Sequence, residues 1–180
     1  LSQYKFIFIG EQHGKEHIPK KVFSFVNELQ GKVIFCVELP QQCEDLLQKY
    51  LEDEISKESL YASPYLQAAL QDKRLRPGIL EMYKKFFRKG ILIHCLENDE
   101  GSPEQRDKNM AQRFFDIVQQ ESADYYLIYA GHVHVMTKTR EIFGIPITPI
   151  PMYLPKEIVQ HAVVLQCLEE DCVVHCEFER

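Results

Sequence analysis

The sequence predicts an α/β fold with a mostly parallel central sheet, flanking helices and a C-terminal antiparallel hairpin. Short apolar runs, bounded by glycine or polar residues, alternate with amphipathic segments at helical spacing. The first strand–helix–strand unit has the crossover length that parallel strands need. Near the end, residues 161–168 and 172–178 alternate apolar and polar side chains on either side of an acidic turn, as hairpin strands do.

The opening unit occupies the first forty residues. An apolar run over 4–9 stops at Gly10 and predicts a buried strand. Apolar residues at helical spacing over 18–30, with Pro19 suited to a first turn, predict the crossover helix. A second apolar run over 33–37 predicts the parallel partner strand.

The later elements follow the same alternation. The pattern predicts helices over 41–55, 79–89, 102–118 and 135–142, and strands over 91–96, 125–130 and 144–151. The last strand contains prolines, which cannot donate to a sheet ladder, so we place it near an edge. The stretch over 56–76 is less regular, and we expect a helical insertion or lid there, within a single domain covering 1–180.

Composition narrows the classes of function. The chain has 180 residues, enough for one buried core. Its net charge of −6 argues against nucleic acid as a partner, because a general nucleic-acid binder needs a basic face. No run of about 18 apolar residues occurs, so we expect a soluble protein without a transmembrane segment. The expected partner is a small-molecule or peptide substrate, and the oligomeric state stays open.

The six cysteines allow two interpretations. Cys36 and Cys95 lie inside apolar runs, where free thiols behave as small hydrophobic residues. Cys167, Cys172 and Cys176 are grouped near the end, but the paired C-x-x-C of common zinc sites is absent. We therefore favour structural thiols over a metal or redox role, and with them a mild preference for the cytoplasm.

Polar side chains follow the predicted strands at the points where they end. Glu11 and His13 follow the first strand, Glu38 the second, and His132 and His134 the fourth. Because parallel strands end at one edge of a sheet, where α/β folds place ligand sites, we expect these side chains to share a pocket. The strand–Gly–x–x–His pattern occurs at both histidine positions, which strengthens the prediction.

Two chemistries suit this set. His13, Glu38 and His134 would ligate a divalent metal such as zinc, manganese or cobalt, which activates water and polarises a carbonyl. In a metal-free alternative, His13, oriented by Glu11 or Glu38, takes a proton from water as general base. In both, Arg106 would hold an anionic group or a developing oxyanion.

Other polar residues are assigned more loosely. His17 and His132 are candidate substrate-binding residues together with Arg106, although each histidine is equally compatible with a structural role. The acids at Glu97 and Asp99 are interpreted as loop residues.

An ordered set of motifs resembles the superfamily of ChaN, Tiki (TraB) and erythromycin-esterase proteins. The motifs are Gly10-Glu11-Gln12-His13-Gly14 with His17, Glu38-Leu39-Pro40, the helix from Arg106 to Ala111, and Gly131-His132-Val133-His134. The R-D-x-x-M-A helix and the second histidine of the opening motif most resemble ChaN-like haem-uptake proteins. The paired G-x-x-H motifs resemble the Tiki group, described as metal-dependent proteases. The opening motif also resembles erythromycin esterases, in which this histidine acts as a base, although their spacing is one residue longer.

The resemblance implies one pocket lined by Glu11, His13, Glu38, Arg106 and His134. Our preferred hypothesis is a hydrolase that cleaves an ester, amide or peptide bond in that pocket. The ChaN-like alternative is a protein that binds haem or iron without turnover. A third hypothesis is a non-catalytic domain of a larger toxin or effector.

Overall fold

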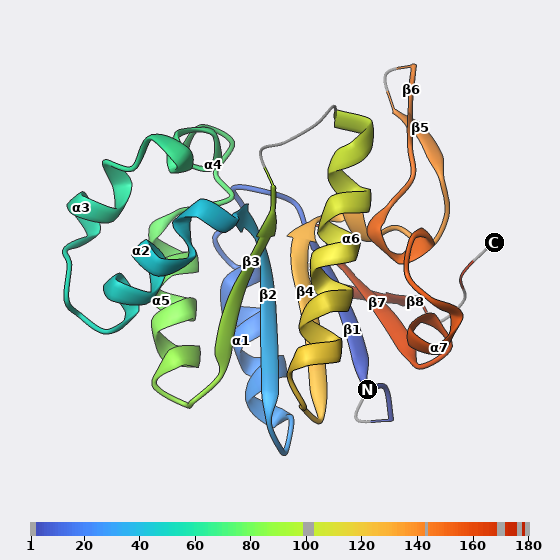
Figure 1. Cartoon of the computed structure of the whole chain (residues 1–180), viewed down its shortest axis with the longest axis horizontal. Coiled ribbons are helices and arrows are strands. Elements are labelled where there is room, and N and C mark those ends of the chain that lie inside the picture. The colour runs from blue at the N-terminus through green and yellow to red at the C-terminus, as the bar shows by residue number, and fades with distance from the viewer. Residues whose placement is uncertain (1–2, 99–102, 143, 169–171, 176–177, 179–180) are drawn as a thin grey trace.

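The computed structural model describes residues 3–98, 103–142, 144–168, 172–175 and 178. A six-stranded sheet with the order β3-β2-β4-β1-β7-β8 forms its centre (Figure 1). The strands are β1 (Phe6–Glu11), β2 (Val33–Pro40), β3 (Leu92–Glu97), β4 (Tyr125–Gly131), β7 (Ala162–Cys167) and β8 (Cys172–His175). All neighbours pair in parallel except β7 and β8, which pair antiparallel. The predicted fold class and its C-terminal hairpin are confirmed.

The strand order decides which side chains meet. β4 lies between β1 and β2, although β1 and β2 follow each other in the sequence. Glu11 at the end of β1 is in register with Gly131 at the end of β4. The carboxyl ends of β1, β4 and β2 therefore lie next to one another, and Glu11 and Glu38 come from the strands on either side of β4.

Helices cover both faces of the sheet (Figure 1). They are α1 (Ile18–Glu28), α2 (Glu44–Leu51) and α5 (Pro77–Phe87) on one face, and α6 (Pro103–Gln120) and α7 (Lys156–Val159) on the other. α1 buries Ile18, Val22 and Val26, which recur at the four-residue spacing of one helix face. Each face of the sheet thus packs against its own apolar cluster. The buried acids Glu11 and Glu38 lie at the carboxyl ends of the strands.

The stretch over 56–76 is helical, as the sequence suggested. It contains α3 (Lys57–Tyr61), the 3₁₀ turn η2 (Pro64–Leu66) and α4 (Gln67–Gln71), and it follows the 3₁₀ turn η1 (Gln41–Cys43) and α2. Ser56 caps α3 by accepting a hydrogen bond from the Ser59 backbone N–H at 3.2 Å. The stretch buries Leu60 and Leu66 against the core and delivers two arginines to the sheet edge.

Two predicted elements are wrong. Residues 135–142 do not form a helix: the 3₁₀ turn η3 (His132–Val135) ends there, and β5 (Arg140–Ile142) follows. The strand predicted over 144–151 shortens to β6 (Ile145–Ile147), which pairs with β5 in a separate hairpin, and then gives way to the 3₁₀ turn η4 (Ile150–Met152). The physical reason is that prolines limit β6, while Gly144 at φ +77° supplies the reversal that joins it to β5.

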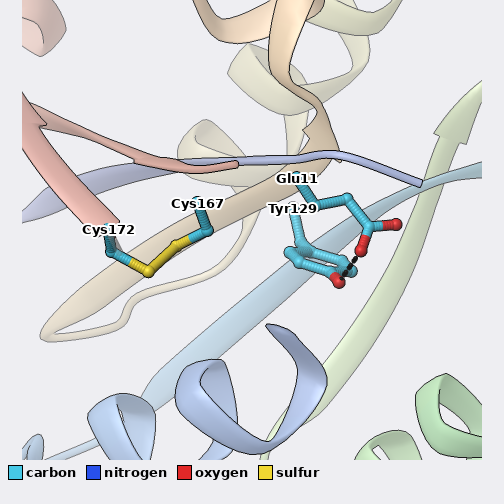
Figure 2. The surroundings of a disulfide bond; sticks show 4 residues. All are labelled: Glu11, Tyr129, Cys167 and Cys172. Carbon is cyan, nitrogen blue, oxygen red and sulfur yellow. Dashed lines mark hydrogen bonds between the residues drawn. A yellow bond between two sulfur atoms is a disulfide. The ribbon is translucent and has the colours of Figure 1, made fainter. Parts of the chain in front are cut away.

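The thiol prediction is wrong for Cys167 and Cys172, which form a disulfide (Figure 2). These two cysteines lie directly opposite each other in the β7–β8 pair, with Cα atoms 4.1 Å apart. The alternating pattern alone does not reveal this register. Cys36 and Cys95 are buried thiols, as expected, and Cys43 is buried as well. The disulfide removes part of the support for a reducing compartment.

No helix in the described part of the chain is both long enough and apolar enough to cross a membrane.

Gly10 is required for close packing rather than for a turn. It lies inside β1, and a Cβ there would come within 2.5 Å of Gln166 Oε1 and 2.9 Å of the His132 backbone. We expect Gly10→Ala to lower the free energy of unfolding by about 1–3 kcal/mol, because these neighbours must shift. Gly78→Ala is the matched control, since its Cβ would approach the carboxylate end of exposed Glu16 at 3.2 Å and Pro19 only at 4.0 Å. Equal urea midpoints for both variants would contradict this account.

Candidate active site

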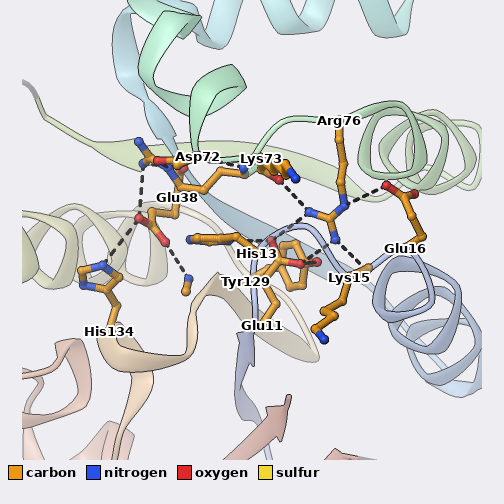
Figure 3. Close-up of polar contacts among 12 residues, drawn as sticks. Glu11, His13, Lys15, Glu16, Glu38, Asp72, Lys73, Arg76, Tyr129 and His134 are labelled. Carbon is orange, nitrogen blue, oxygen red and sulfur yellow. Dashed lines mark hydrogen bonds and ion pairs between the residues drawn. The ribbon is translucent and has the colours of Figure 1, made fainter. Parts of the chain in front are cut away.

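Two buried carboxylates stand at the carboxyl edge of the sheet. Glu11 at the end of β1 is 1% exposed and Glu38 in β2 is 4% exposed. An ionised carboxylate taken out of water costs several kcal/mol unless it gains charged and hydrogen-bonding partners. Both carboxylates are held by such partners, several of which are shown in Figure 3.

The first cluster is built on Glu11. Arg76 reaches both carboxylate oxygens, with its two terminal nitrogens at 3.3 Å and 3.0 Å. The Tyr129 hydroxyl donates to Oε2, and His13 Nδ1 lies 2.9 Å from Oε1. Because the Glu11 carboxylate only accepts, this hydrogen bond places a proton on His13 Nδ1 and leaves Nε2 outside the contact.

Burial and the neighbouring Glu11 carboxylate raise the pKa of Tyr129 well above its usual value. The Tyr129 hydroxyl therefore stays protonated at physiological pH, and its hydrogen bond to Oε2 holds the Glu11 carboxylate in position.

The second cluster is built on Glu38. Arg106 donates to Oε1, Arg74 approaches the same oxygen at 3.2 Å, and the Gly131 N–H donates to Oε2 at 2.6 Å. Burial alone would raise the pKa of Glu38, but His134, the two arginines and the Gly131 N–H outweigh it and lower that pKa to about 2. Glu38 is therefore a permanent anion in the folded protein.

Glu97 extends this cluster. Its carboxylate oxygens lie 2.6 Å from Arg74 and 2.7 Å from the Nε of Arg106. Its interpretation as a loop residue is wrong, since it closes β3 beside Glu38. Asp99, assigned to the same loop, lies outside the described residues.

His134 is the second histidine of the site. Its Nδ1 lies 2.5 Å from Asp107 Oδ1, and its Nε2 lies 3.6 Å from Glu38 Oε1. Burial would lower the pKa of His134, but the Glu38 carboxylate and the hydrogen bond to Asp107 outweigh it and raise that pKa. His134 therefore keeps its proton to higher pH than an exposed histidine.

His13 and Glu38 both lie against Gly131. A Cβ on Gly131 would stand 2.9 Å from His13 Nε2 and 3.4 Å from Glu38 Oε2. Since Glu38 also faces His134, its carboxylate lies between the two imidazole rings (Figure 3). Of the five residues expected to share one pocket, Glu11, His13 and Glu38 line one small cavity, whereas Arg106 and His134 line another. The two groups are linked by the contacts of Glu38 with Arg106 and His134.

Neither of the other two candidates lines the cavity beside Glu11 and Glu38, although the His132 side chain hydrogen-bonds to the Glu11 backbone. His17 is at the N-cap of α1, and the contacts described for Glu11 and Glu38 do not include it. The His132 carbonyl accepts a hydrogen bond from Gln166 at 3.2 Å, and the side chain lines a different surface hollow with Met136 and Lys138. Burial lowers the pKa of His132, which favours the neutral ring.

Sequence reasoning missed four participants: Arg74, Arg76, Asp107 and Tyr129. The arginines belong to Arg74-Leu75-Arg76-Pro77, directly before α5, where two buried cations alternate with a buried leucine. That short motif was the available signal. Asp107 follows Arg106 in the helix, and Tyr129 sits two residues from the end of an apolar strand.

The donor set does not fit a metal ion. The described residues contain no group of three His, Cys, Asp or Glu side chains arranged to hold one. Glu38, one of three expected ligands, already accepts from two guanidinium groups, whose positive charge opposes a cation. Metal and haem binding stay predictions, and no chemical step proposed below uses either.

The raised pKa of His134 predicts a loss of stability at alkaline pH. The contribution of His134 to the free energy of unfolding is fully present below its pKa in the unfolded chain, about 6.5. It is lost as pH rises through its pKa in the folded protein. The lowered pKa of Glu38 acts at the other end: its contribution is present above about 4.3 and is lost as pH falls through about 2. Urea unfolding between about pH 6 and 9 tests the first claim. The alkaline decline should be weaker in His134→Gln than in the wild type, and an unchanged slope would contradict it.

No protein-family model and no curated protein matches the sequence. Solved structures do match. The type III effector HopBA1 has a TM-score of 0.60 and 16% identity, covering 91% of this chain and 76% of that one. A crystal structure of bacterial protein toxins matches with a TM-score of 0.60 and 16% identity, covering 97% of this chain and 36% of that one.

The Pasteurella multocida toxin, whose C-terminal region is described as holding a thiol-protease-like catalytic triad, gives a TM-score of 0.61 and 10% identity. This chain is covered over 98% of its length but spans only 24% of that toxin. At such identities the likeness concerns the fold alone. The chain therefore shares its α/β fold with bacterial toxin and effector structures.

Proposed function

We propose that the chain is a hydrolase that cleaves an ester, amide or peptide bond by general acid–base catalysis at the carboxyl edge of the sheet. The observation that carries the proposal is the pair of histidines on either side of Glu38. Each has its Nδ1 on a carboxylate, so the Nε2 atoms of both are the working atoms.

His13 acts as the general base. Glu11 fixes its tautomer, and Arg76 and Tyr129 hold Glu11 in turn. A cavity of about 10 Å³ beside it is bounded by both clusters, and this volume suits a single water molecule. The residues around that cavity are Glu11, His13, Glu38, Arg74, Tyr83, Tyr129 and Ala130. Water there would give its proton to His13 Nε2 and attack a carbonyl.

His134 acts as the general acid. Its raised pKa favours the cationic form, which gives the Nε2 proton to the leaving oxygen or nitrogen. Arg106 is 28% exposed and lines the larger cavity beside His134, so its guanidinium is placed to stabilise the oxyanion that forms on the attacked carbonyl. After the step His13 holds the proton taken from water and His134 lacks one, and proton exchange with solvent returns both to their starting states.

The described cysteines support histidine chemistry over a thiol nucleophile. Burial raises the pKa of Cys36 and of Cys95 far above the usual value, which keeps both thiols protonated. Cys43 is also buried, and Cys167 and Cys172 are joined to each other.

The test is hydrolysis in ¹⁸O-labelled water of a panel of p-nitrophenyl esters, anilides and peptides, with chelator present and absent. One labelled oxygen should enter the acid product with the wild type. The His13→Gln/His134→Gln double variant should give only the background rate. Equal product from both proteins would reject the assignment.

A second candidate is a non-catalytic domain of a larger toxin or effector. It is favoured by the fold likeness to such chains and by the arginines that already occupy Glu11 and Glu38. In that case the clusters serve stability alone, and no substrate of the panel is turned over although the protein is folded.

A further inference from the structure

A second cavity, of about 510 Å³, opens beside His134, the proposed general acid. Its polar wall consists of Arg106, Asp107 and His134, which also belong to the site described above. This volume falls within the range of small-molecule binding sites, about 300–1,000 Å³. The cavity therefore adjoins the proposed general acid and Arg106, and it is large enough for a substrate.

The opposite wall is apolar and comes from the β5–β6 hairpin. Ile142 is in register with Ile145, and Ile147 lies two residues further on, so the three side chains share one face of the hairpin. All three line the cavity, together with Val133 and Tyr153.

The fold itself does not bury this face. Ile145 is 54% exposed and Tyr153 is 38% exposed, although both are large apolar side chains. A two-stranded hairpin alone is marginally stable in water. An apolar ligand that covers this exposed face would remove apolar surface from water and so stabilise the hairpin.

We propose that this cavity binds the hydrocarbon or aromatic part of the substrate, with the carbonyl to be cleaved placed at His134 and Arg106. The substrate class is thus an ester or amide with an apolar acyl group of several carbons. The inference rests on the proposed hydrolase function for its reaction, but the binding claim can be tested without turnover.

The binding test uses octanoate, butanoate and acetate as product mimics in an NMR titration of the whole chain. The carboxylate of each acid corresponds to the acid product of hydrolysis and would bind at Arg106. Each methylene that is fully buried raises the affinity by up to about fourfold. We expect octanoate to bind at least tenfold more tightly than butanoate and to shift the amide signals of Ile145 and Ile147.

Ile145→Ser should weaken octanoate binding at least fivefold. Leu92→Ser is the matched control, because Leu92 is 40% exposed on the edge strand β3 and lines neither cavity of the site. Octanoate affinity that is the same in Ile145→Ser and wild type would overturn the proposal.

Turnover separates this inference from the one before it. With p-nitrophenyl octanoate, Ile145→Ser should raise KM at least fivefold and leave kcat within twofold. If octanoate binds as expected but no ester is hydrolysed, the hydrolase proposal fails and the apolar pocket stands. If esters are hydrolysed at rates independent of acyl length, the pocket proposal fails and the hydrolase stands.

Discussion

His13→Gln is expected to reduce the rate of hydrolysis by a factor of about 10²–10⁴, the usual contribution of a positioned general base. Glutamine keeps a polar group of similar length near Glu11, so the Arg76 and Tyr129 contacts to that carboxylate are retained. It has no basic nitrogen to take the proton of water. The measurement is kcat/KM for whichever ester the wild type hydrolyses.

His161→Gln is the matched control for this loss. His161 is an exposed histidine directly before β7, at the amino end of the strands, where its carbonyl accepts from the Phe6 N–H. Its kcat/KM should be unchanged. The pH profile adds a second readout: the alkaline fall in rate, at which His134 loses its proton, should be absent in His134→Gln. Wild-type rates in His13→Gln would show that the base lies elsewhere.

Arg76→Met is expected to lower the free energy of unfolding by about 3–5 kcal/mol, the usual cost of removing one partner from a buried ion pair. The Arg76 and Glu11 side chains are 6% and 2% exposed, so water cannot replace the guanidinium. The carbonyls of Lys73 and Lys15 would lose a donor as well. Urea unfolding at pH 7 gives the value.

Two comparisons make this prediction specific. Glu11→Gln combined with Arg76→Met should recover part of the loss, because the uncompensated charge is then gone. Lys85→Met removes an exposed pair with Glu81, whose side chains are 47% and 68% exposed, and should change stability by less than about 1 kcal/mol. A cost for Arg76→Met as small as that for Lys85→Met would show that Glu11 is not held by its charge partner.

The strand-end principle found the core of the site from sequence. Glu11, Glu38 and His134 each follow or end an apolar run, and any parallel sheet brings such ends to one edge. The principle does not depend on the order of strands, which is why it succeeded although β4 separates β1 from β2.

The missed residues lack such a signal. Arg74 and Arg76 come from an irregular connection, and their burial depends on carboxylates far away in the sequence. The disulfide between Cys167 and Cys172 likewise depends on the register of the β7–β8 hairpin. The β5–β6 hairpin depends on a turn at Gly144, which prevents the helix that the local spacing of apolar residues predicts. Each of these is a tertiary effect that a local pattern does not contain.

The placement of β4 between β1 and β2 also has a consequence for synthesis on the ribosome. When residues up to 120 have emerged, β2 and β3 can already pair, but β1 has neither of its neighbours, β4 and β7. At that point the apolar strand β1 has unpaired backbone groups along both edges. Such edges favour aggregation and chaperone binding. The nascent chain thus completes this edge of the sheet only after β4 has emerged, although β1 is the first strand described.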